Sequence, residues 1–293
     1  MSKLVKRRRS GTMTAILGID AAWTAGNRSG VALVVERHGT WRCAGVAPSY
    51  LDFIALAKDE AINWSKPRPG SEPDIDSFIA AAEQLAGGER PGVVAVDMPI
   101  ATNGRIIKRR KADKETSERF GKFGCPVHSP TKERPGKFGE RFMRALEDAG
   151  YPLSPEATDS HTRWMQPTTI EVYPHAAIVR LMRLKKRLKY KVGRSWKLWH
   201  GEPVTTRIGH LLEAFRKLKA ALDRKIAGID LPLPALADVR SLSSLKAYED
   251  ALDALVCAWV GICYLEGRAE ALGDETAAIW VPTKEVRSAP SRP

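Results

Sequence analysis

Cysteine is scarce in this sequence of 293 residues, and long hydrophobic runs are absent. Four scattered cysteines are too few for a disulfide-stapled scaffold, so the sequence favours a reducing, cytoplasmic environment. The longest apolar stretch, residues 255–265, is too short to cross the roughly 30 Å hydrocarbon core of a bilayer. The apolar segment after the basic residues 6–9 is interrupted by Asp20, so no secretory signal peptide is predicted. We therefore expect no membrane partner.

The composition is that of an ordinary folded protein, with 43% hydrophobic and 28% charged residues. This length and composition exclude a chain that is disordered throughout and a fibrous repeat. We predict one domain over residues 14–283 that carries an insertion at about 101–168. A basic flexible arm at 1–13 and a flexible tail at 284–293 are expected to flank it.

The apolar pattern predicts an α/β fold. Three strands joined by short turns, at 15–23, 30–35 and 40–46, make an antiparallel meander. Two nearly continuous apolar segments, 92–97 and 168–173, are expected to be strands buried on both faces, and connection through helices implies a parallel crossover. Apolar residues at helical spacing predict helices at 50–64, 74–86, 139–149, 176–190, 205–226 and 243–267, before a last short strand at 277–282. This is the element order of a ribonuclease H-like mixed sheet flanked by helices.

Basic residues outnumber acidic ones by 47 to 34, and the excess is concentrated in two segments. Residues 101–144 contain 13 basic and 5 acidic side chains, whereas residues 180–197 contain nine basic side chains and no acidic one. Aromatic residues lie among the latter, and this mixture can hold phosphates and stack bases. We predict nucleic acid as the partner, although a solvated helix face is the alternative. The expected contacts from the second segment are Arg183, Lys186, Arg187 and Lys189.

Acidic residues stand near the ends of the predicted strands and at the start of the last helix. They are Asp20, Asp97, Glu171, Asp250 and Asp253. The ends of strands beside a topological switch converge on one crevice, and a carboxylate there is costly to bury without a cation or donors. Clustered carboxylates suit Mg²⁺ or Mn²⁺, and two ions roughly 3.5–4 Å apart can activate water and stabilise the departing oxygen of a phosphodiester. Each carboxylate alone could instead be a helix cap or a salt-bridge partner.

Four motifs resemble, in their order, a domain-of-unknown-function family of predicted ribonuclease H-like nucleases. They are Gly18–Ala22, Val96–Pro99, Glu171–Pro174 and Asp250–Leu255. The last motif is also similar to the final acidic helix of Holliday junction resolvases, which implies a homodimer, although no interface motif stands out. The resemblance extends from about Ala15 to Pro282 and implies a metal-dependent phosphodiesterase.

The resemblance also assigns roles to individual residues. Asp20, Asp97 and Asp253 match metal-ligand positions, whereas Glu171 matches a family motif without an assigned role. Our own hypothesis is that Glu171 or Asp250 completes the metal shell or orients the water. The segment 110–119 resembles an Arg/Asp/Arg signature of the family, so Arg110, Asp113 and Arg119 are expected to contact substrate.

We therefore predict a Mg²⁺- or Mn²⁺-dependent nuclease that hydrolyses phosphodiester bonds. A catalytically inactive nucleic-acid-binding module of the same fold is the first alternative. A phosphotransferase of the actin and sugar-kinase type is the second, but it needs two such cores and glycine-rich phosphate loops, and the sequence offers one meander. The loop at 24–30 could contact a phosphate through backbone N–H groups or form an ordinary hairpin turn.

Overall fold

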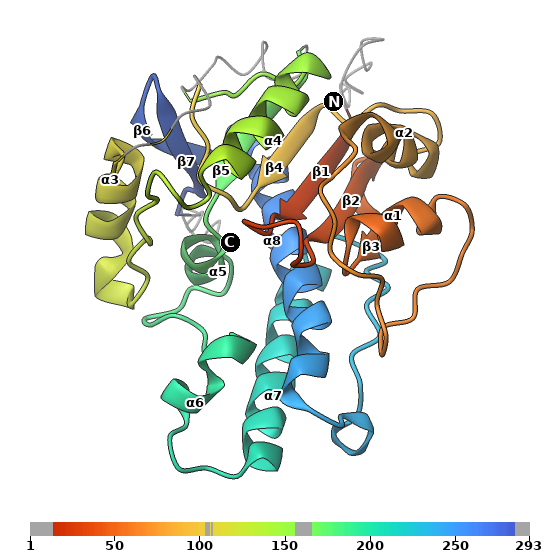
Figure 1. Ribbon diagram of the computed structural model, residues 1–293, viewed down its shortest axis with the longest axis vertical. Coiled ribbons are helices and arrows are strands. Elements are labelled where there is room, and N and C mark those ends of the chain that lie inside the picture. The colour runs from red at the N-terminus through yellow and green to blue at the C-terminus, as the bar shows by residue number, and fades with distance from the viewer. Residues whose placement is uncertain (1–13, 103–105, 107, 156–165, 285–293) are drawn as a thin grey trace, which may run out of the picture.

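Seven strands form one mixed sheet in the computed structural model, which describes residues 14–102, 106, 108–155 and 166–284 (Figure 1). The strand order is β3-β2-β1-β4-β5-β7-β6. The strands are β1 (Ala15–Asp20), β2 (Gly30–Arg37), β3 (Thr40–Ala47), β4 (Val93–Val96), β5 (Thr168–Val172), β6 (Ala269–Asp274) and β7 (Ala277–Pro282). The predicted arm at 1–13 and all of the predicted tail except residue 284 lie outside the described residues.

The sheet combines an antiparallel meander with parallel strands. β1, β2 and β3 are antiparallel, whereas β4, β5 and β7 run parallel to β1. Ile19 pairs with Val96, and Val96 with Glu171, so the carboxyl ends of β1, β4 and β5 reach the same edge. The predicted α/β fold with a single mixed sheet flanked by helices is confirmed, and it is consistent with a ribonuclease H-like fold. β6 pairs with β7 as an antiparallel hairpin that was not predicted.

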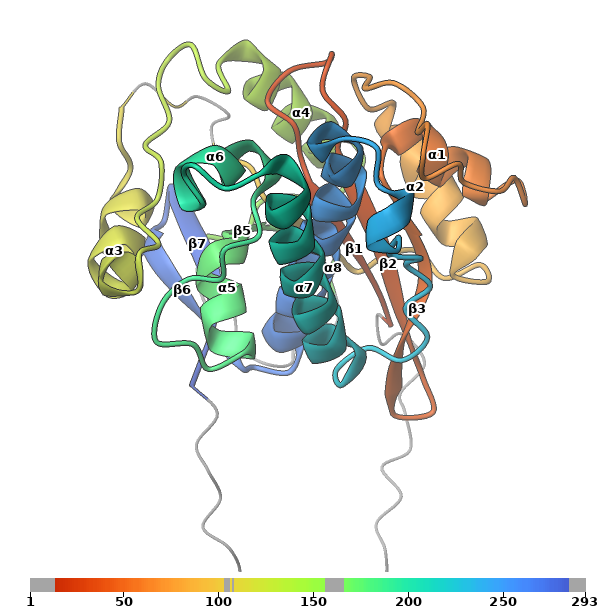
Figure 2. The ribbon, with the colours of Figure 1, turned by 90° about the horizontal axis from the view of Figure 1, so that it is seen from below.

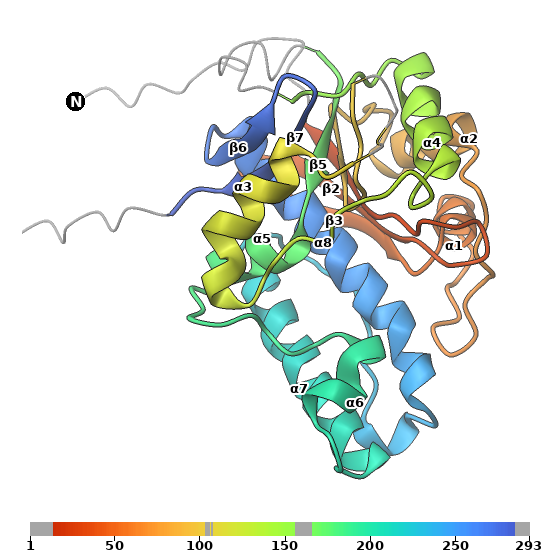
Figure 3. The ribbon, with the colours of Figure 1, turned by 60° about the vertical axis from the view of Figure 1, so that its left-hand side comes forward.

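Helices cover both faces of the sheet (Figures 2 and 3). They are α1 (Tyr50–Leu56), α2 (Ile75–Leu85), α3 (Lys111–Phe120), α4 (Lys137–Asp148), α5 (Pro174–Leu181), α6 (Ser195–Leu198), α7 (Val204–Asp223) and α8 (Lys246–Leu265). Because successive side chains of a strand point to opposite faces, Ile16 packs in the core with α7 and α8, whereas Leu17 packs in the core with α1, α2 and α4. Among the described residues, every helix is too short or too polar to cross a bilayer.

Two predicted helices are shorter than expected. α1 ends at Leu56 instead of continuing to about residue 64, and α5 ends at Leu181 instead of about residue 190. In both cases a residue with a positive φ follows, Asp59 with φ 61° and Arg183 with φ 53°. Glycine is the usual residue at such a position, so the sequence carries no obvious stop signal there. The correction places the basic segment from residue 183 to Lys191 in irregular backbone.

The predicted insertion contains a helix that the sequence analysis missed. α3 packs against the hairpin of β6 and β7, and of its ten residues only Ala112, Asp113, Thr116 and Phe120 are buried. Such a narrow and partly polar buried face produces a weak apolar pattern. α4, the other helix of this region, matches the prediction closely.

A candidate active site at the carboxyl edge of the sheet

Two glycines allow α8 to lie directly on β1 and β2. A Cβ atom at Gly18 would stand 2.2 Å from the carbonyl oxygen of Ala254, and one at Gly30 would stand 2.0 Å from that of Asp250. Both distances are far below a normal contact, so any larger residue would push the helix away from the strands. The close approach brings the first turns of α8 against the end of β1, where Asp20 lies.

Four of the predicted carboxylates come together here. Asp20 is the last residue of β1, and Asp97 directly follows β4, where its N–H donates to the Ile19 carbonyl oxygen at 2.8 Å. Asp250 and Asp253 lie in the first half of α8 and are 2% and 0% exposed. The fold therefore brings four of the five predicted carboxylates near one another, and two of them, Asp20 and Asp250, line one crevice.

Burial and mutual repulsion perturb these carboxyl groups. Burial raises the pKa of Asp20 well above 3.8, and the nearby charges of Asp253 and Asp250 raise it further. Burial also raises the pKa of Asp97 to about 7, with a smaller upward contribution from Asp253 that Lys191 opposes. Burial and the neighbouring charges therefore favour the protonated, neutral form of these carboxyl groups, and ionising them requires compensating positive charge.

Two lysines compensate part of this charge. The Lys191 ammonium contacts the Asp253 carboxylate and lies 3.3 Å from Glu249, whereas the Lys246 ammonium contacts Asp250 and lies 2.9 Å from Glu249. Burial alone would raise the pKa of Glu249, but the positive charges of Lys191 and Lys246 outweigh this effect and hold the pKa below its usual range. Neither lysine nor Glu249 was among the predicted site residues.

The segment before α6 is tied to the same helix by two further hydrogen bonds. The Tyr190 hydroxyl donates to Asp253 Oδ1 at 2.6 Å, and the Val192 N–H donates to Glu249 Oε2 at 2.5 Å. Tyr190 is fully buried, so its hydroxyl has a fixed partner. These bonds hold Lys191, which lies between them in the sequence, against the acidic face of α8.

Asp20 and Asp97 differ from Asp250 and Asp253 in their partners. Within the described part of the chain, neither Asp20 nor Asp97 accepts a side-chain hydrogen bond or forms an ion pair, and only longer-range charges act on them. A buried carboxylate without a partner is costly, so these two side chains are the ones that a bound cation would stabilise most.

A crevice of about 350 Å³ opens beside Asp20 and Asp250. Lys246 also lines it, as do residues of the turn between β1 and β2, including Arg28. The Arg28 Nε atom is buried and has no hydrogen-bond partner among the described residues. The crevice therefore places two cationic side chains beside two carboxylates. Arg28 was not singled out from the sequence, although it stands in the turn that follows Asp20.

Glu171 has a different environment. Its two carboxylate oxygens accept from both terminal nitrogens of Arg110, at 2.5 and 2.7 Å, and one of them accepts from the Ile100 N–H at 3.1 Å. Arg110 also donates to Asp113 at 2.6 Å, and both side chains are at least 92% buried. Arg110 and Asp113, predicted as substrate contacts, thus belong to a buried ion-pair network that attaches α3 to β5.

The other predicted substrate contacts lie outside the crevice. Arg119 forms an ion pair with Glu270 at 3.1 Å. Lys186 donates to the Lys122 carbonyl oxygen at 3.0 Å, and the exposed Lys189 lies in the same irregular segment. Of the remaining two, Arg187 is partly buried near Phe123, and Arg183 lines a separate cavity.

The donor set and its arrangement differ in how well they suit a metal ion. Carboxylate oxygens are the ligands that Mg²⁺ and Mn²⁺ prefer. Among the described residues, however, no group of three His, Cys, Asp or Glu side chains is placed to hold an ion, and the ammonium groups of Lys191 and Lys246 contact Asp253 and Asp250. The described residues therefore fit a divalent cation in the kind of their donor atoms but not in their present arrangement.

Comparison with protein-family models matches most of the chain. A family model described as "Protein of unknown function (DUF429)" matches residues 18–278, a range that contains all the candidate carboxylates. No curated protein and no solved structure matches the chain.

Proposed function

The chain belongs to the DUF429 family of proteins of unknown function, so we infer its activity from its site. We propose that the protein is a metal-dependent nuclease that hydrolyses phosphodiester bonds. One observation carries the proposal. Asp20 and Asp97 lie at the carboxyl ends of neighbouring parallel strands as buried carboxylates without partners in the described chain, and the crevice beside Asp20 presents two cationic side chains. This combination suits a substrate that is itself a phosphate ester.

Asp20 and Asp97 would hold the divalent ion. Asp253 would become a third ligand by releasing its contact with Lys191. When bound, Mg²⁺ or Mn²⁺ supplies positive charge that activates water and stabilises the departing oxygen. The Tyr190 hydroxyl keeps the Asp253 carboxylate in one orientation through its 2.6 Å hydrogen bond. A residue that is remote in the sequence, Tyr190, thus orients the predicted ligand Asp253.

Arg28 and Lys246 bind the phosphate in this proposal. Both line the crevice beside Asp20, and Arg28 Nε lacks a partner among the described residues. A guanidinium group matches the geometry of two phosphate oxygens, and the ammonium adds a point charge. The two side chains would orient one phosphodiester toward the carboxylates.

A second function has one specific observation in its favour. Lys191 and Lys246 already compensate Asp253 and Asp250, as expected of a nucleic-acid-binding module that has lost its metal. Such a module would bind nucleic acid in a salt-dependent manner without cleaving it. The phosphotransferase alternative has no comparable support, because the described residues form one sheet and not two related cores.

Cleavage of a labelled substrate panel tests the proposal. The panel contains single strands, duplexes, an RNA–DNA hybrid and a four-way junction, each incubated with Mg²⁺, Mn²⁺ or EDTA. We expect cleavage of at least one substrate that EDTA abolishes and that Asp20→Asn also abolishes. Asp76→Asn, an exposed carboxylate in the first turn of α2, is the matched control and should cleave like the wild type.

Each other outcome has a defined meaning. Salt-sensitive binding without cleavage under any metal would replace the nuclease by the inactive binding module. Cleavage that survives Asp20→Asn at the wild-type rate would refute the site, because the activity would then reside elsewhere.

A further inference from the structure

One tryptophan is unusually exposed. Trp196 of α6 is 53% exposed, more than any other large hydrophobic residue in the described part of the chain. Tryptophan side chains are highly buried on average. A single exposed apolar side chain needs no explanation by itself, so its meaning depends on its neighbours.

The neighbours of Trp196 hold its ring in place. The Arg207 guanidinium lies over the indole, with its Cζ atom 5.3 Å from the ring centroid. The His200 ring meets the indole edge-on, with 4.8 Å between the ring centroids. A cation over an aromatic face is an attractive contact. The indole is therefore fixed while it stays half-exposed, so a ring that stacks on it would cost little side-chain entropy.

Arg207 is a buried cation without a carboxylate partner among the described residues. It is 7% exposed, its Nη1 donates to Ser195 Oγ at 3.5 Å, and its Nε has no hydrogen-bond partner there. Glu202, the nearest carboxylate in the sequence, lies 2.8 Å from His210 instead. Buried charges in folded proteins are normally paired. An anion bound beside Trp196 would compensate the charge of Arg207.

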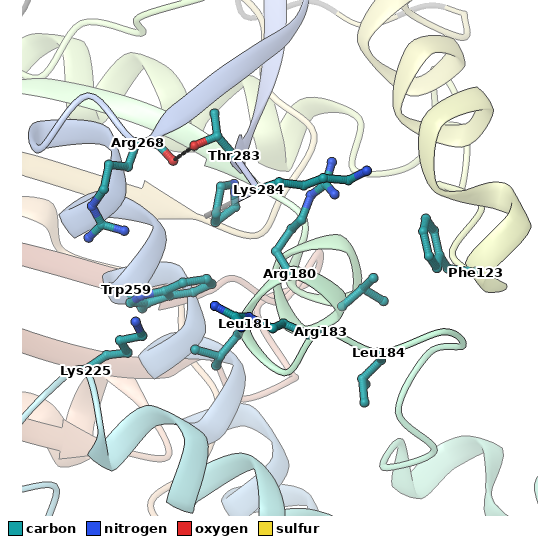
Figure 4. A pocket seen from close by; sticks show the side chains of 12 residues that line it. Phe123, Arg180, Leu181, Arg183, Leu184, Lys225, Trp259, Arg268, Thr283 and Lys284 are labelled. Carbon is teal, nitrogen blue, oxygen red and sulfur yellow. Dashed lines mark hydrogen bonds between the residues drawn. The ribbon is translucent and has the colours of Figure 1, made fainter. Parts of the chain in front are cut away.

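The chain that leads to α6 carries further positive charge. Residues 185–197 contain seven basic side chains and no acidic one. Of these seven, only Lys191 forms an ion pair with a described residue. The segment leaves α5 at a cavity that Arg183 and Leu184 line, and it runs from there to α6 beside α7 (Figures 3 and 4). Six cations without a counter-ion attract a polyanion to this segment.

The same segment is anchored at the acidic site. Tyr190 and Lys191 both contact Asp253. Trp196 stands five residues after Lys191, so their Cα atoms are at most about 18 Å apart. This distance corresponds to about five nucleotides at the spacing of a stacked strand. A strand bound along the segment therefore passes close to the candidate carboxylates.

We propose that Trp196 stacks on a base of single-stranded nucleic acid, and that the phosphates of this strand follow the basic residues of 185–197. Proteins that bind single strands combine cations along the backbone with an aromatic side chain under a base. A single strand fits better than a duplex, whose bases are stacked on one another and present no free face. The binding stands on α6 and its neighbours, whereas the assignment of this strand as substrate rests on the function proposed above.

Fluorescence anisotropy of a labelled oligothymidylate of about 12 nucleotides tests this proposal on the full chain. EDTA keeps the strand uncut, and a duplex and an abasic sugar-phosphate strand of the same length are titrated beside it. Trp196→Leu should weaken binding to the oligothymidylate by at least about fivefold, the usual loss for one base–aromatic stack, whereas Trp196→Phe should keep most of the affinity. Neither the duplex nor the abasic strand should distinguish Trp196→Leu from the wild type. An RNA strand should show the same dependence on Trp196, because every base has a flat face.

Matched variants separate stacking from charge. Lys197→Gln should reduce the slope of log affinity against log salt by about 0.7, the value for one phosphate contact of a single strand. Lys217→Gln removes an exposed lysine of α7 that pairs with Glu213, so it should leave the slope and the affinity unchanged. Leu236→Ala, at another exposed apolar residue, should also bind like the wild type. Circular dichroism establishes that each variant is folded.

The proposal is overturned if the oligothymidylate gives no saturable binding, if folded Trp196→Leu binds it as tightly as the wild type, or if the abasic strand binds the wild type equally well. Failure of the nuclease is a separate result. Binding that depends on Trp196, without cleavage in Mg²⁺ or Mn²⁺, would refute the nuclease and leave the stacking site in place.

Cleavage of a single strand adds a kinetic test. Trp196→Leu should then raise KM without lowering kcat, because the indole contacts the substrate away from the reacting phosphate. Unchanged KM and kcat would overturn the stacking role and leave the nuclease in place.

Discussion

Lys191→Met removes the ammonium group that compensates the acidic face of α8. In the wild type this group contacts Asp253, whose side chain is 0% exposed, and lies 3.3 Å from Glu249. Removing one partner of a buried ion pair leaves an uncompensated charge, which usually costs about 3–5 kcal/mol. Lys191 is 22% exposed and Asp253 keeps its hydrogen bond from Tyr190, so we expect a loss of about 3 kcal/mol.

Urea unfolding at pH 8 in the presence of EDTA measures this loss. Lys189→Met is the matched control, because Lys189 is exposed and stands two residues earlier in the same segment. Its free energy of unfolding should change by less than about 0.5 kcal/mol. The difference between the two variants should shrink in acid, because a protonated Asp253 carboxyl no longer needs a cation.

A divalent cation should then replace the missing ammonium. Mn²⁺ at about 100 times its dissociation constant should raise the free energy of unfolding of Lys191→Met by about 2.7 kcal/mol, because a ligand that binds only the folded state stabilises that state. The wild type should gain less at the same concentration, since Lys191 competes for Asp253. The reasoning is refuted if Lys191→Met and Lys189→Met are equally stable in EDTA, or if Mn²⁺ stabilises both variants equally.

Three further substitutions probe the fold and the site. Burial raises the pKa of Asp97 from an ordinary 3.8 to about 7, so between these pH values the folded state holds a proton that the unfolded state releases. The free energy of unfolding of the wild type therefore falls as the pH rises through this window. In urea titrations, Asp97→Asn should be more stable than the wild type by about 2–4 kcal/mol at pH 8, and by little at pH 4. Arg110→Met leaves two buried carboxylates unpaired and should cost about 3–5 kcal/mol of unfolding free energy, so a loss below about 1 kcal/mol would contradict the structural role of this ion pair. Gly18→Ala should cost at least about 2 kcal/mol in thermal and urea unfolding because its Cβ would meet the Ala254 carbonyl oxygen, whereas Gly209→Ala on α7, which meets nothing within 4 Å, should be neutral or stabilising.

The strands were predictable because burial on both faces leaves a clear pattern. β4 consists of four apolar residues, Val93–Val96, and is buried throughout, so its run is continuous and bounded by Gly92 and Asp97. The helix ends were less predictable. α1 and α5 stop before Asp59 and Arg183, residues whose identity does not signal a left-handed conformation.

The acidic side of the site was predictable for a topological reason, and its basic side was not. Asp20 and Asp97 follow apolar strands, so the parallel register places them at one edge of the sheet. Lys191 stands 62 residues before Asp253, and only the folded chain brings the two together. Glu249 had a detectable signal, because it lies four residues before Asp253 and therefore on the same face of α8.

Mn²⁺ binding to the wild type and to Asp20→Asn tests most directly whether the unpaired carboxylates form a cation site. Isothermal titration of both proteins, with Asp76→Asn as the control, requires no knowledge of the nucleic-acid substrate. We expect saturable binding to the wild type and to Asp76→Asn, and a loss of at least about tenfold in affinity for Asp20→Asn, the loss expected for one charged ligand. Equal Mn²⁺ affinity in all three proteins, or none in any, would contradict the assignment of Asp20 and Asp97 as the metal-binding centre.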